Sequence, residues 1–258
     1  MKGVEVNWIG LYALVRREVA RVFRVIGQTL AAPLVSAFLF IFIFGFILGQ
    51  KIDLIGGIPY MQFVFPGILM MNILTASFMH ASNGIYFARF IRTIEEILVA
   101  PLSYVEMVTA YVVSALVRAF LIGAGILVIG IIFGAVEFAR IELFIFYTAA
   151  IAIVFALLGI IVGLWAKGFE QLNILNTFII MPLSFLGGMF YSIDLLPELA
   201  QKITLANPIF YFIDGMRFAM TGYHESNLFV GLLIIGGLIL GLGLLVWYLF
   251  KTGWRLRE

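Results

Sequence analysis

The stretch LFIFYTAAIAIVFALLGIIVGLWA, residues 143–166, decides the fold of this chain. It carries no charged residue, and it is longer than the roughly 20 apolar residues that an α-helix needs to cross the hydrocarbon core of a bilayer. The run is continuous, whereas the strands of a membrane β-barrel alternate apolar and polar residues. The stretch therefore predicts a membrane-spanning helix.

Five further runs of this kind surround it. We expect spans at residues 30–49, 62–83 and 108–134, within residues 171–191, and within residues 228–250. The composition agrees, because 64% of the chain is hydrophobic and 12% is charged, whereas a soluble domain has about 45–50% apolar and about 25% charged residues. The sequence predicts an all-α integral membrane protein with six transmembrane helices.

Lysine and arginine placement predicts the orientation. Cytoplasmic loops of membrane proteins carry an excess of these residues. If the N-terminus is cytoplasmic, eleven of them fall on the inner side and four on the outer side, with Arg118 left out as intramembrane. The four outer ones are Lys51, Arg140, Lys202 and Arg217. We therefore expect a multi-pass protein with both termini in the cytoplasm.

The segment before the first span has the pattern of an interfacial helix. Its apolar residues follow the 3/4 spacing of one helical face, and its arginines occupy a separate arc of about 140°. The apolar set is Trp8, Leu11, Tyr12, Val15, Val19, Val22, Phe23 and Ile26, and the cationic set is Arg16, Arg17, Arg21 and Arg24. Such a helix suits the lipid headgroup boundary, although the same pattern also fits an amphipathic helix packed on a partner.

Residues 89–106, RFIRTIEEILVAPLSYVE, connect the second and third spans. Ile91, Ile94, Ile97 and Leu98 share one face of the predicted helix, and Pro101 ends it within a turn. Ser103-x-x-Glu106 is a capping box that opens the third span. An exposed apolar stripe of this kind needs a partner or lipid to cover it. We therefore expect a short amphipathic helix on the cytoplasmic side, the alternative being a solvated connector.

The segment after the fifth span is apolar but too short to cross. Gly187 and Gly188 fall in the last turns of that span, and we expect two short helices broken at Asn207-Pro208, because proline disfavours helix at the preceding residue. Irregular backbone at membrane depth must be covered by protein or face a water-filled cavity. This segment, which continues to Arg217, is predicted to dip into the outer leaflet.

The sequence offers no catalytic constellation of its own. The chain has no cysteine and two histidines, and neither histidine has a partner at metal-ligand spacing. It lacks a Gly-x-x-x-x-Gly-Lys-Ser/Thr loop for nucleotides and a basic tract for nucleic acid. No acidic residue lies inside a predicted span, which disfavours the alternative function of a self-sufficient ion-coupled carrier or membrane-embedded enzyme.

Arg118 is the charge placed well inside a predicted span. An intramembrane ionisable residue is a functional candidate, since its burial costs at least about 2.5–3.5 kcal/mol. The structural alternative is that Arg118 snorkels or pairs with Glu106 or a neighbouring helix. Glycine pairs four residues apart also permit close helix contacts; they are Gly45/Gly49, Gly130/Gly134, Gly159/Gly163 and Gly237/Gly241.

Four runs together carry a resemblance to a known family. They are residues 60–67 (YMQFVFPG), 94–101 (IEEILVAP), 185–192 (FLGGMFYS) and 207–217 (NPIFYFIDGMR). With these runs the chain resembles, essentially from end to end, the permease subunits of ABC-2 type exporters. The resemblance implies residues 1–28 as an N-terminal interfacial connecting helix and residues 29–258 as an ABC-2 type transmembrane domain of the cell's inner membrane.

The resemblance further implies partners and site residues. The permease would form a homodimer with a second copy of itself and would bind two cytoplasmic ABC ATPase subunits, which would hold ATP and Mg²⁺; the chain itself would have no cofactor, no metal and no enzymatic activity. The coupling helix that contacts the ATPase would include Arg89, Arg92, Glu95, Glu96, Ile97, Leu98 and Pro101. The connecting helix would carry Arg16, Arg17, Arg21 and Arg24. The outer gate segment would include Gly187, Gly188, Asn207, Pro208 and Arg217. The cargo would be an amphipathic drug, lipid or lipid-linked glycan, and membrane lipids would be further partners. Arg118 stays the intramembrane candidate because of its position in the third span, independently of the resemblance.

Overall fold

The computed structural model of this chain describes residues 7–52 and 54–256. Among them are six helices that are long and apolar enough to cross a membrane, which confirms the predicted number of spans. They are Thr29–Ile47, Tyr60–Phe90, Tyr104–Ile132, Ile141–Trp165, Phe169–Leu186 and Leu228–Thr252. The second span runs seven residues past its expected end at 83, so the connector to the third span is shorter than predicted.

The chain is almost wholly helical, with one short hairpin. The α-helices are α1 (Trp8–Arg24), α2 (Ile26–Phe40), α3 (Tyr60–Phe90), α4 (Thr93–Val99), α5 (Tyr104–Ile132), α6 (Ile141–Trp165), α7 (Phe169–Leu175), α8 (Met181–Leu186), α9 (Glu198–Ala206), α10 (Pro208–Thr221) and α11 (Leu228–Thr252). π-Helical turns at Ile41–Ile47 and Asn176–Ile180 and 3₁₀ turns at Leu48–Gln50 and Ile193–Leu195 extend or join them. The strands β1 (Leu54–Ile55) and β2 (Ile58–Pro59) pair antiparallel.

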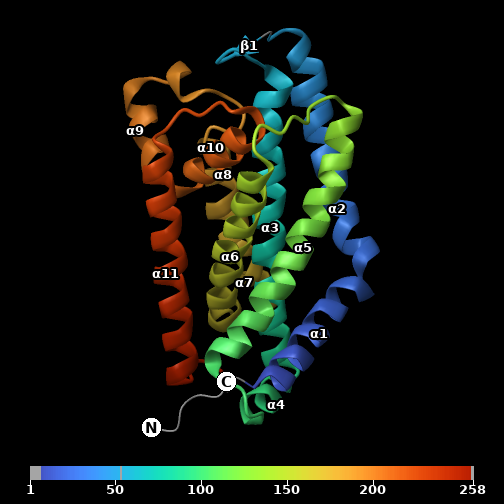
Figure 1. The fold of residues 1–258 in the computed structure, drawn as a ribbon. Coiled ribbons are helices and arrows are strands. Elements are labelled where there is room, and N and C mark those ends of the chain that lie inside the picture. Colours follow the sequence, from blue (N-terminus) through green and yellow to red (C-terminus); the bar gives the residue numbers. More distant parts are fainter. Residues whose placement is uncertain (1–6, 53, 257–258) are drawn as a thin grey trace.

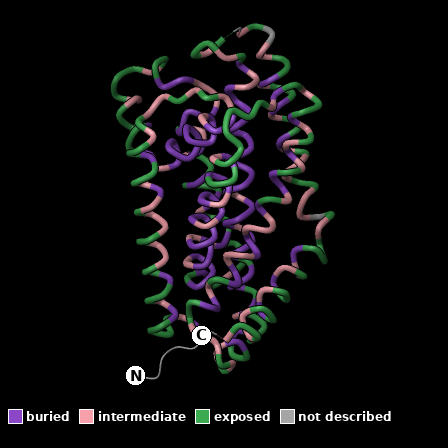
Figure 2. Tube along the Cα trace, viewed as in Figure 1, coloured by how far each residue is buried: buried purple, intermediate pink, exposed green. Residues whose placement is uncertain are grey.

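α3 is the central helix of the bundle. It is surrounded by α5, α6 and α10 (Figure 1), and most of its residues are buried. At 1.5 Å per residue, its 31 residues extend about 46 Å, which exceeds the hydrocarbon thickness of about 30 Å. Figure 2 shows the buried residues concentrated on this axis and on α10, whereas α11 and the helix that begins with α2 are mostly exposed along their lengths. The peripheral spans therefore keep apolar surfaces for lipid or another subunit.

Two glycines of α6 let it pack closely on α3. A Cβ atom at Gly159 would meet the backbone carbonyl of Phe78, and one at Gly163 would lie 2.6 Å from the carbonyl oxygen of Ser82. The predicted Gly159/Gly163 contact is thus confirmed. The pair Gly237/Gly241 on α11 meets no neighbour within 4 Å, so its spacing marks no contact within the described part of this chain.

The two ends of the bundle differ. One end carries α4, with Asn7 and Leu256 close to it. The opposite end carries the β1–β2 hairpin, α9 and the C-terminal end of α10 (Figure 1), where the carbonyls of Ala219 and Met220 accept the N–H groups of Arg140 and Ala139. An even number of spans accounts for the position of Asn7 and Leu256 at the same end. We call these the α4 end and the α9 end.

Candidate functional site

The corner between α3 and α4 places the predicted ATPase-contacting segment at the tip of the α4 end. Arg92 adopts a left-handed conformation there, with φ +62°, and α4 then runs for only seven residues before Ala100-Pro101. The predicted short helix therefore occupies Thr93–Val99 within the connector 89–106. Arg92, Glu95, Glu96, Val99 and Pro101 are exposed.

The apolar face of α4 is partly covered by the chain itself. Ile94 and Ile97 are 3% and 6% exposed, in a buried cluster that includes Leu14 of α1, Ile85 of α3 and Met107 of α5. The prediction of an uncovered stripe therefore holds only in part, because Leu98 is half-buried and Ile91 is exposed. The surface of α4 that remains for another protein combines the carboxylates of Glu95 and Glu96 with the apolar side chain of Val99.

Arg89 contacts the C-terminal end of α6. Its Nη1 donates hydrogen bonds to the carbonyl oxygens of Gly163, Leu164 and Ala166, at 3.0, 2.8 and 3.2 Å. These are the last carbonyls of α6 and its C-terminal cap, which helical hydrogen bonds leave open, and a cation at a helix C-terminus is stabilising. Arg89 therefore fastens α3 to α6, a structural role that the sequence did not predict, and its predicted contact with the ATPase stays a prediction.

Glu106 joins the first turns of α1 and α5. The predicted capping box is confirmed, because Glu106 Oε2 accepts the Ser103 N–H at 2.6 Å and Ser103 Oγ accepts the Glu106 N–H at 3.3 Å. Glu106 Oε1 also accepts the backbone N–H of Asn7 at 2.7 Å. The Asn7 side chain caps α1 through Gly10 and donates to the Pro101 carbonyl. We call these hydrogen bonds the Glu106 junction; it ties α1, the end of the α4 segment and α5 together.

α1 divides its apolar residues between two environments. The apolar residues Leu14 and Val22 are buried toward the bundle, whereas Trp8, Tyr12 and Phe23 are exposed. Glu18 is buried as well. The carboxylate of Glu18 bridges Arg17 at 2.9 Å and Arg21 at 2.7 Å. The four arginines are thus not one free cationic face: Arg16 and Arg24 are exposed, and the middle two pair with a glutamate that the sequence pattern did not single out.

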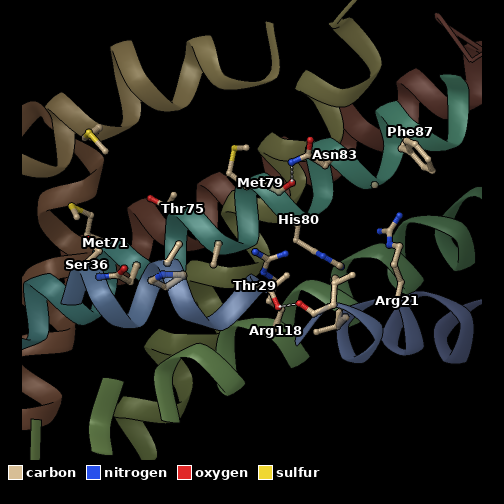
Figure 3. A pocket seen from close by; sticks show the side chains of 18 of the residues that line it. Arg21, Thr29, Ser36, Met71, Thr75, Met79, His80, Asn83, Phe87 and Arg118 are labelled. Atoms are coloured by element: carbon tan, nitrogen blue, oxygen red, sulfur yellow. Dashed lines mark hydrogen bonds between the residues drawn. The ribbon is translucent and has the colours of Figure 1, made fainter. Parts of the chain in front are cut away.

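A cavity of about 620 Å³ opens between α2 and α3. Arg21 of α1 and Arg118 of α5 line it together with His80 and Asn83 of α3 (Figure 3). The His80 Nε2 and Ser114 Oγ are 2.9 Å apart and share a hydrogen bond. Thr29, Ser36, Asn72 and Thr75 are further polar lining residues.

Arg118 does not pair with Glu106, because Glu106 lies twelve residues nearer the start of α5, about 18 Å along the helix axis, where it binds Asn7 and Ser103. Its Nε is buried, and among the described residues it has no hydrogen-bond partner. No aspartate or glutamate appears among the described residues that line the cavity. The structure thus rejects the Glu106 alternative for this intramembrane charge.

At the α9 end, the chain breaks between α9 and α10 at Asn207, as expected. The Asn207 side chain accepts the Ile209 N–H at 3.0 Å and so caps α10, and its Nδ2 donates to the Leu183 carbonyl at 2.6 Å. Pro208 occupies the first position of α10, where a missing N–H is harmless. Gly187 follows α8, and Gly188 has a left-handed backbone with φ +74°.

Arg217 is fully buried, although it was counted among the outer surface cations. Its Nε donates to the Phe63 carbonyl at 3.2 Å, its Nη2 to the Gly188 carbonyl at 2.7 Å, and its Nη1 pairs with Glu225 at 3.2 Å. The guanidinium also lies 3.7 Å from the centre of the Phe63 ring. We call these contacts the Arg217 hub. Arg217 joins α3, the α8–α9 connection and the loop before α11.

Two carboxylates near this hub escaped sequence reasoning. Asp214 is buried and accepts the N–H groups of Glu225 and Ser226 at 2.8 and 2.9 Å. Burial raises the pKa of the Glu225 carboxyl above its usual range, and the charge of Arg217 opposes that shift. The available sequence signal was the i, i+3 spacing of Asp214 and Arg217 on one helix; their burial depends on contacts distant in the chain.

Comparisons with known proteins match the whole length of the bundle. A family model described as ABC-2 type transporter matches residues 10–221. The inner membrane transport permease YadH of Escherichia coli (strain K12) is 32% identical over 252 residues, which cover 97% of this chain and 98% of that protein. Nodulation protein J of Rhizobium meliloti (strain 1021) is 28% identical over 220 residues, which cover 84% and 82% of the two chains.

Proposed function

The chain belongs to the ABC-2 type transporter family and is a membrane permease subunit of an ABC exporter, and we propose that it works as a homodimer that docks two cytoplasmic ATPase subunits through α4. The main support for docking is that α4 lies at one end of the bundle, where the exposed residues of α4 and its flanks include Arg92, Glu95, Glu96 and Pro101. The chain has no nucleotide-binding loop, so ATP and Mg²⁺ bind to the ATPase subunits.

The α4 end faces the cytoplasm of an inner membrane in this proposal. The excess of lysine and arginine on that side supports it, and the excess grows when the buried Arg217 is removed from the outer count, which leaves Lys51, Arg140 and Lys202. α1 lies at the headgroup boundary, because Trp8, Tyr12 and Phe23 remain exposed on a helix that also carries exposed arginines. Residues 1–28 then form the interfacial connecting segment of a transmembrane domain that continues to residue 258.

The broken segment α9–α10 closes the outer exit of the path in this proposal. At the break, the Asn207 side chain makes hydrogen bonds with the Leu183 carbonyl and the Ile209 N–H. Irregular backbone within a bilayer requires hydrogen bonds of this kind from the protein itself. The apolar surfaces of α2 and α7 that the chain leaves exposed are available to the second copy. The path between two copies suits an amphipathic cargo.

Motion of α4 reaches the spans through the Glu106 junction. ATP-driven closure of the ATPase subunits displaces α4, and Pro101 is linked by Asn7 to the first turn of α1. Glu106 begins α5 and binds Asn7 as well. A displacement of α4 is therefore passed to α1 and α5 at the same time.

Charge removal on α4 tests the docking proposal. We expect the Glu95→Ala/Glu96→Ala double variant to reduce co-purification of the ATPase subunit and the ATP hydrolysis that depends on transport. Both side chains are exposed, so the bundle keeps its thermal stability. Glu198→Ala, at an exposed position of the α9 end, is the matched control. Co-purification and hydrolysis equal to those of the control would reject α4 as the docking site.

A further inference from the structure

The cavity between α2 and α3 carries an excess of positive charge. Arg21 and Arg118 line it, and the described lining residues include no carboxylate. The buried carboxylate of Glu18, also on α1, neutralises part of this charge because it pairs with both Arg17 and Arg21. Three arginines against one glutamate leave a net charge of about +2 near the cavity, with His80 counted as neutral.

Close packing against Gly84 of α3 positions the Arg21 side chain at the cavity wall. A Cβ atom at position 84 would collide with Arg21 Nη2, so glycine at that position of α3 lets the guanidinium lie against the helix. Arg118 reaches the same cavity from α5, on the other side of His80 (Figure 3). Two cations from different helices thus converge where a bilayer makes unpaired charge expensive.

The rest of the lining is apolar and adaptable. Met71, Met79, Met181, Phe87 and Phe169 contribute most of the large side chains, and methionine packs against ligands of irregular shape. Phe87 and Phe169 are 47% and 51% exposed; they lie in the last turns of α3 and at the start of α7, so the cavity opens toward the α4 end. Its volume, about 620 Å³, is in the range of small-molecule sites.

We propose that this cavity binds an anionic amphiphile, with its head group between Arg118 and Arg21 and its apolar part against the methionines and phenylalanines. A phosphate-type head group matches two guanidinium groups, since arginine binds phosphate through paired hydrogen bonds. It also gives the Arg118 Nε the acceptor that the described protein groups do not provide. The inference rests on the proposed export function, because it names the class of cargo, and it assigns the entry of that cargo to the cytoplasmic leaflet.

Binding to the purified full-length permease tests the site directly. The probe is dioctanoyl phosphatidic acid, with uncharged dioctanoylglycerol and inorganic phosphate as comparisons, measured by native mass spectrometry in detergent. We expect Arg118→Gln to weaken phosphatidic acid binding about tenfold, the equivalent of about 1.4 kcal/mol, and Arg118→Lys to retain part of the affinity. Binding of dioctanoylglycerol, which has the same acyl chains and no phosphate, should be equal in all three proteins.

Matched variants separate ligand recognition from folding. Arg140→Gln removes an exposed arginine at the α9 end, outside the cavity, and should bind phosphatidic acid as the parent protein does. Arg21→Gln removes the second guanidinium of the cavity while Glu18 keeps its ion pair with Arg17, and its phosphatidic acid affinity should also fall. Phosphatidic acid affinity unchanged by Arg118→Gln, or reduced equally by Arg140→Gln, would overturn the proposal.

Hydrolysis by the reconstituted permease–ATPase complex distinguishes the two sources of such a ligand. A cargo head group stimulates ATP hydrolysis in an Arg118-dependent manner, whereas a resident membrane phospholipid binds with the same Arg118 dependence and no stimulation. Stimulation supports both the anionic site and the class of cargo, whereas binding without stimulation would overturn the assignment of the ligand as cargo. Loss of ATPase co-purification in the Glu95→Ala/Glu96→Ala variant concerns docking alone, so the failure of one proposal is distinguishable from the failure of the other.

Discussion

Removal of the Arg217 guanidinium should destabilise the α9 end strongly. Arg217→Met keeps a long apolar side chain but leaves Glu225 as a buried carboxylate and deprives the Phe63 and Gly188 carbonyls of their donors. Breaking a buried pair by removing one partner costs about 3–5 kcal/mol. For a chain of this size, one kcal/mol shifts Tm by about 2–4 °C, so we expect Tm to fall by roughly 6–20 °C.

Intrinsic tryptophan fluorescence during heating in one detergent measures this shift. Arg140→Met is the matched control, because Arg140 is exposed and lies over Phe218 at 4.7 Å, a contact that contributes about 0.5–1 kcal/mol. The double variant Arg217→Met/Glu225→Leu removes both charges. It should cost less than the sum of the single changes by about 0.5–3 kcal/mol, the usual coupling of contacting residues.

Two results would refute this account of the Arg217 hub. The first is an Arg217→Met shift no larger than that of Arg140→Met, which would mean that the burial of the guanidinium carries little free energy. The second is strict additivity of the Arg217 and Glu225 changes, which would mean that the ion pair at 3.2 Å is not an energetic unit.

Two further predictions concern the helix contacts. Glu106→Gln should lower the transport-coupled ATPase rate, because it weakens the charge-assisted hydrogen bonds to Asn7 and Ser103. Co-purification of the ATPase should persist, since the exposed surface of α4 is unchanged. An unchanged coupled rate would contradict a role for the Glu106 junction. Gly159→Ala should lower Tm, since its Cβ would meet the Phe78 backbone, whereas Gly237→Ala, with open space around it, should leave Tm unchanged or raise it through about 1 kcal/mol of helix propensity.

The sequence was sufficient for the features that depend on local composition. Six charge-poor runs predicted six spans, the Ser103–Glu106 spacing predicted a capping box that both hydrogen bonds confirm, and Asn207-Pro208 predicted a helix break that is observed. Bilayer solvation acts on each helix independently, so these features require no knowledge of the neighbours.

The features that the sequence did not show all involve contacts between residues far apart in the chain. Arg89 was expected at an ATPase contact, yet it also donates to carbonyl oxygens more than 70 positions away. Arg217 was counted among the outer-side cations, yet it is buried and donates to Phe63, 154 positions away. The stripe on α4 was expected to be uncovered, and nothing in its periodicity shows that Ile94 and Ile97 join a buried cluster with Leu14. The burial of a polar residue is decided by such partners rather than by its local pattern.

The Arg217 hub and Arg118 in the cavity therefore differ in whether the chain supplies hydrogen-bond partners for the guanidinium. At the Arg217 hub the guanidinium is satisfied by Phe63, Gly188 and Glu225, so the chain itself accounts for its burial. In the cavity, the Arg118 Nε has no acceptor among the described residues, so this buried N–H can donate to a ligand.

The cavity and the Glu106 junction are built on the same two helices. Arg21 is carried by α1 and Arg118 by α5, the two helices whose first turns meet at Glu106. Under the proposed function, ATPase closure displaces α4 and shifts α1 and α5 through that junction. The separation of the two guanidinium groups then changes with the state of the ATPase. A site built from two helices in this way can hold an anionic head group in one state and release it in the other, because the Coulomb attraction between charges falls with distance.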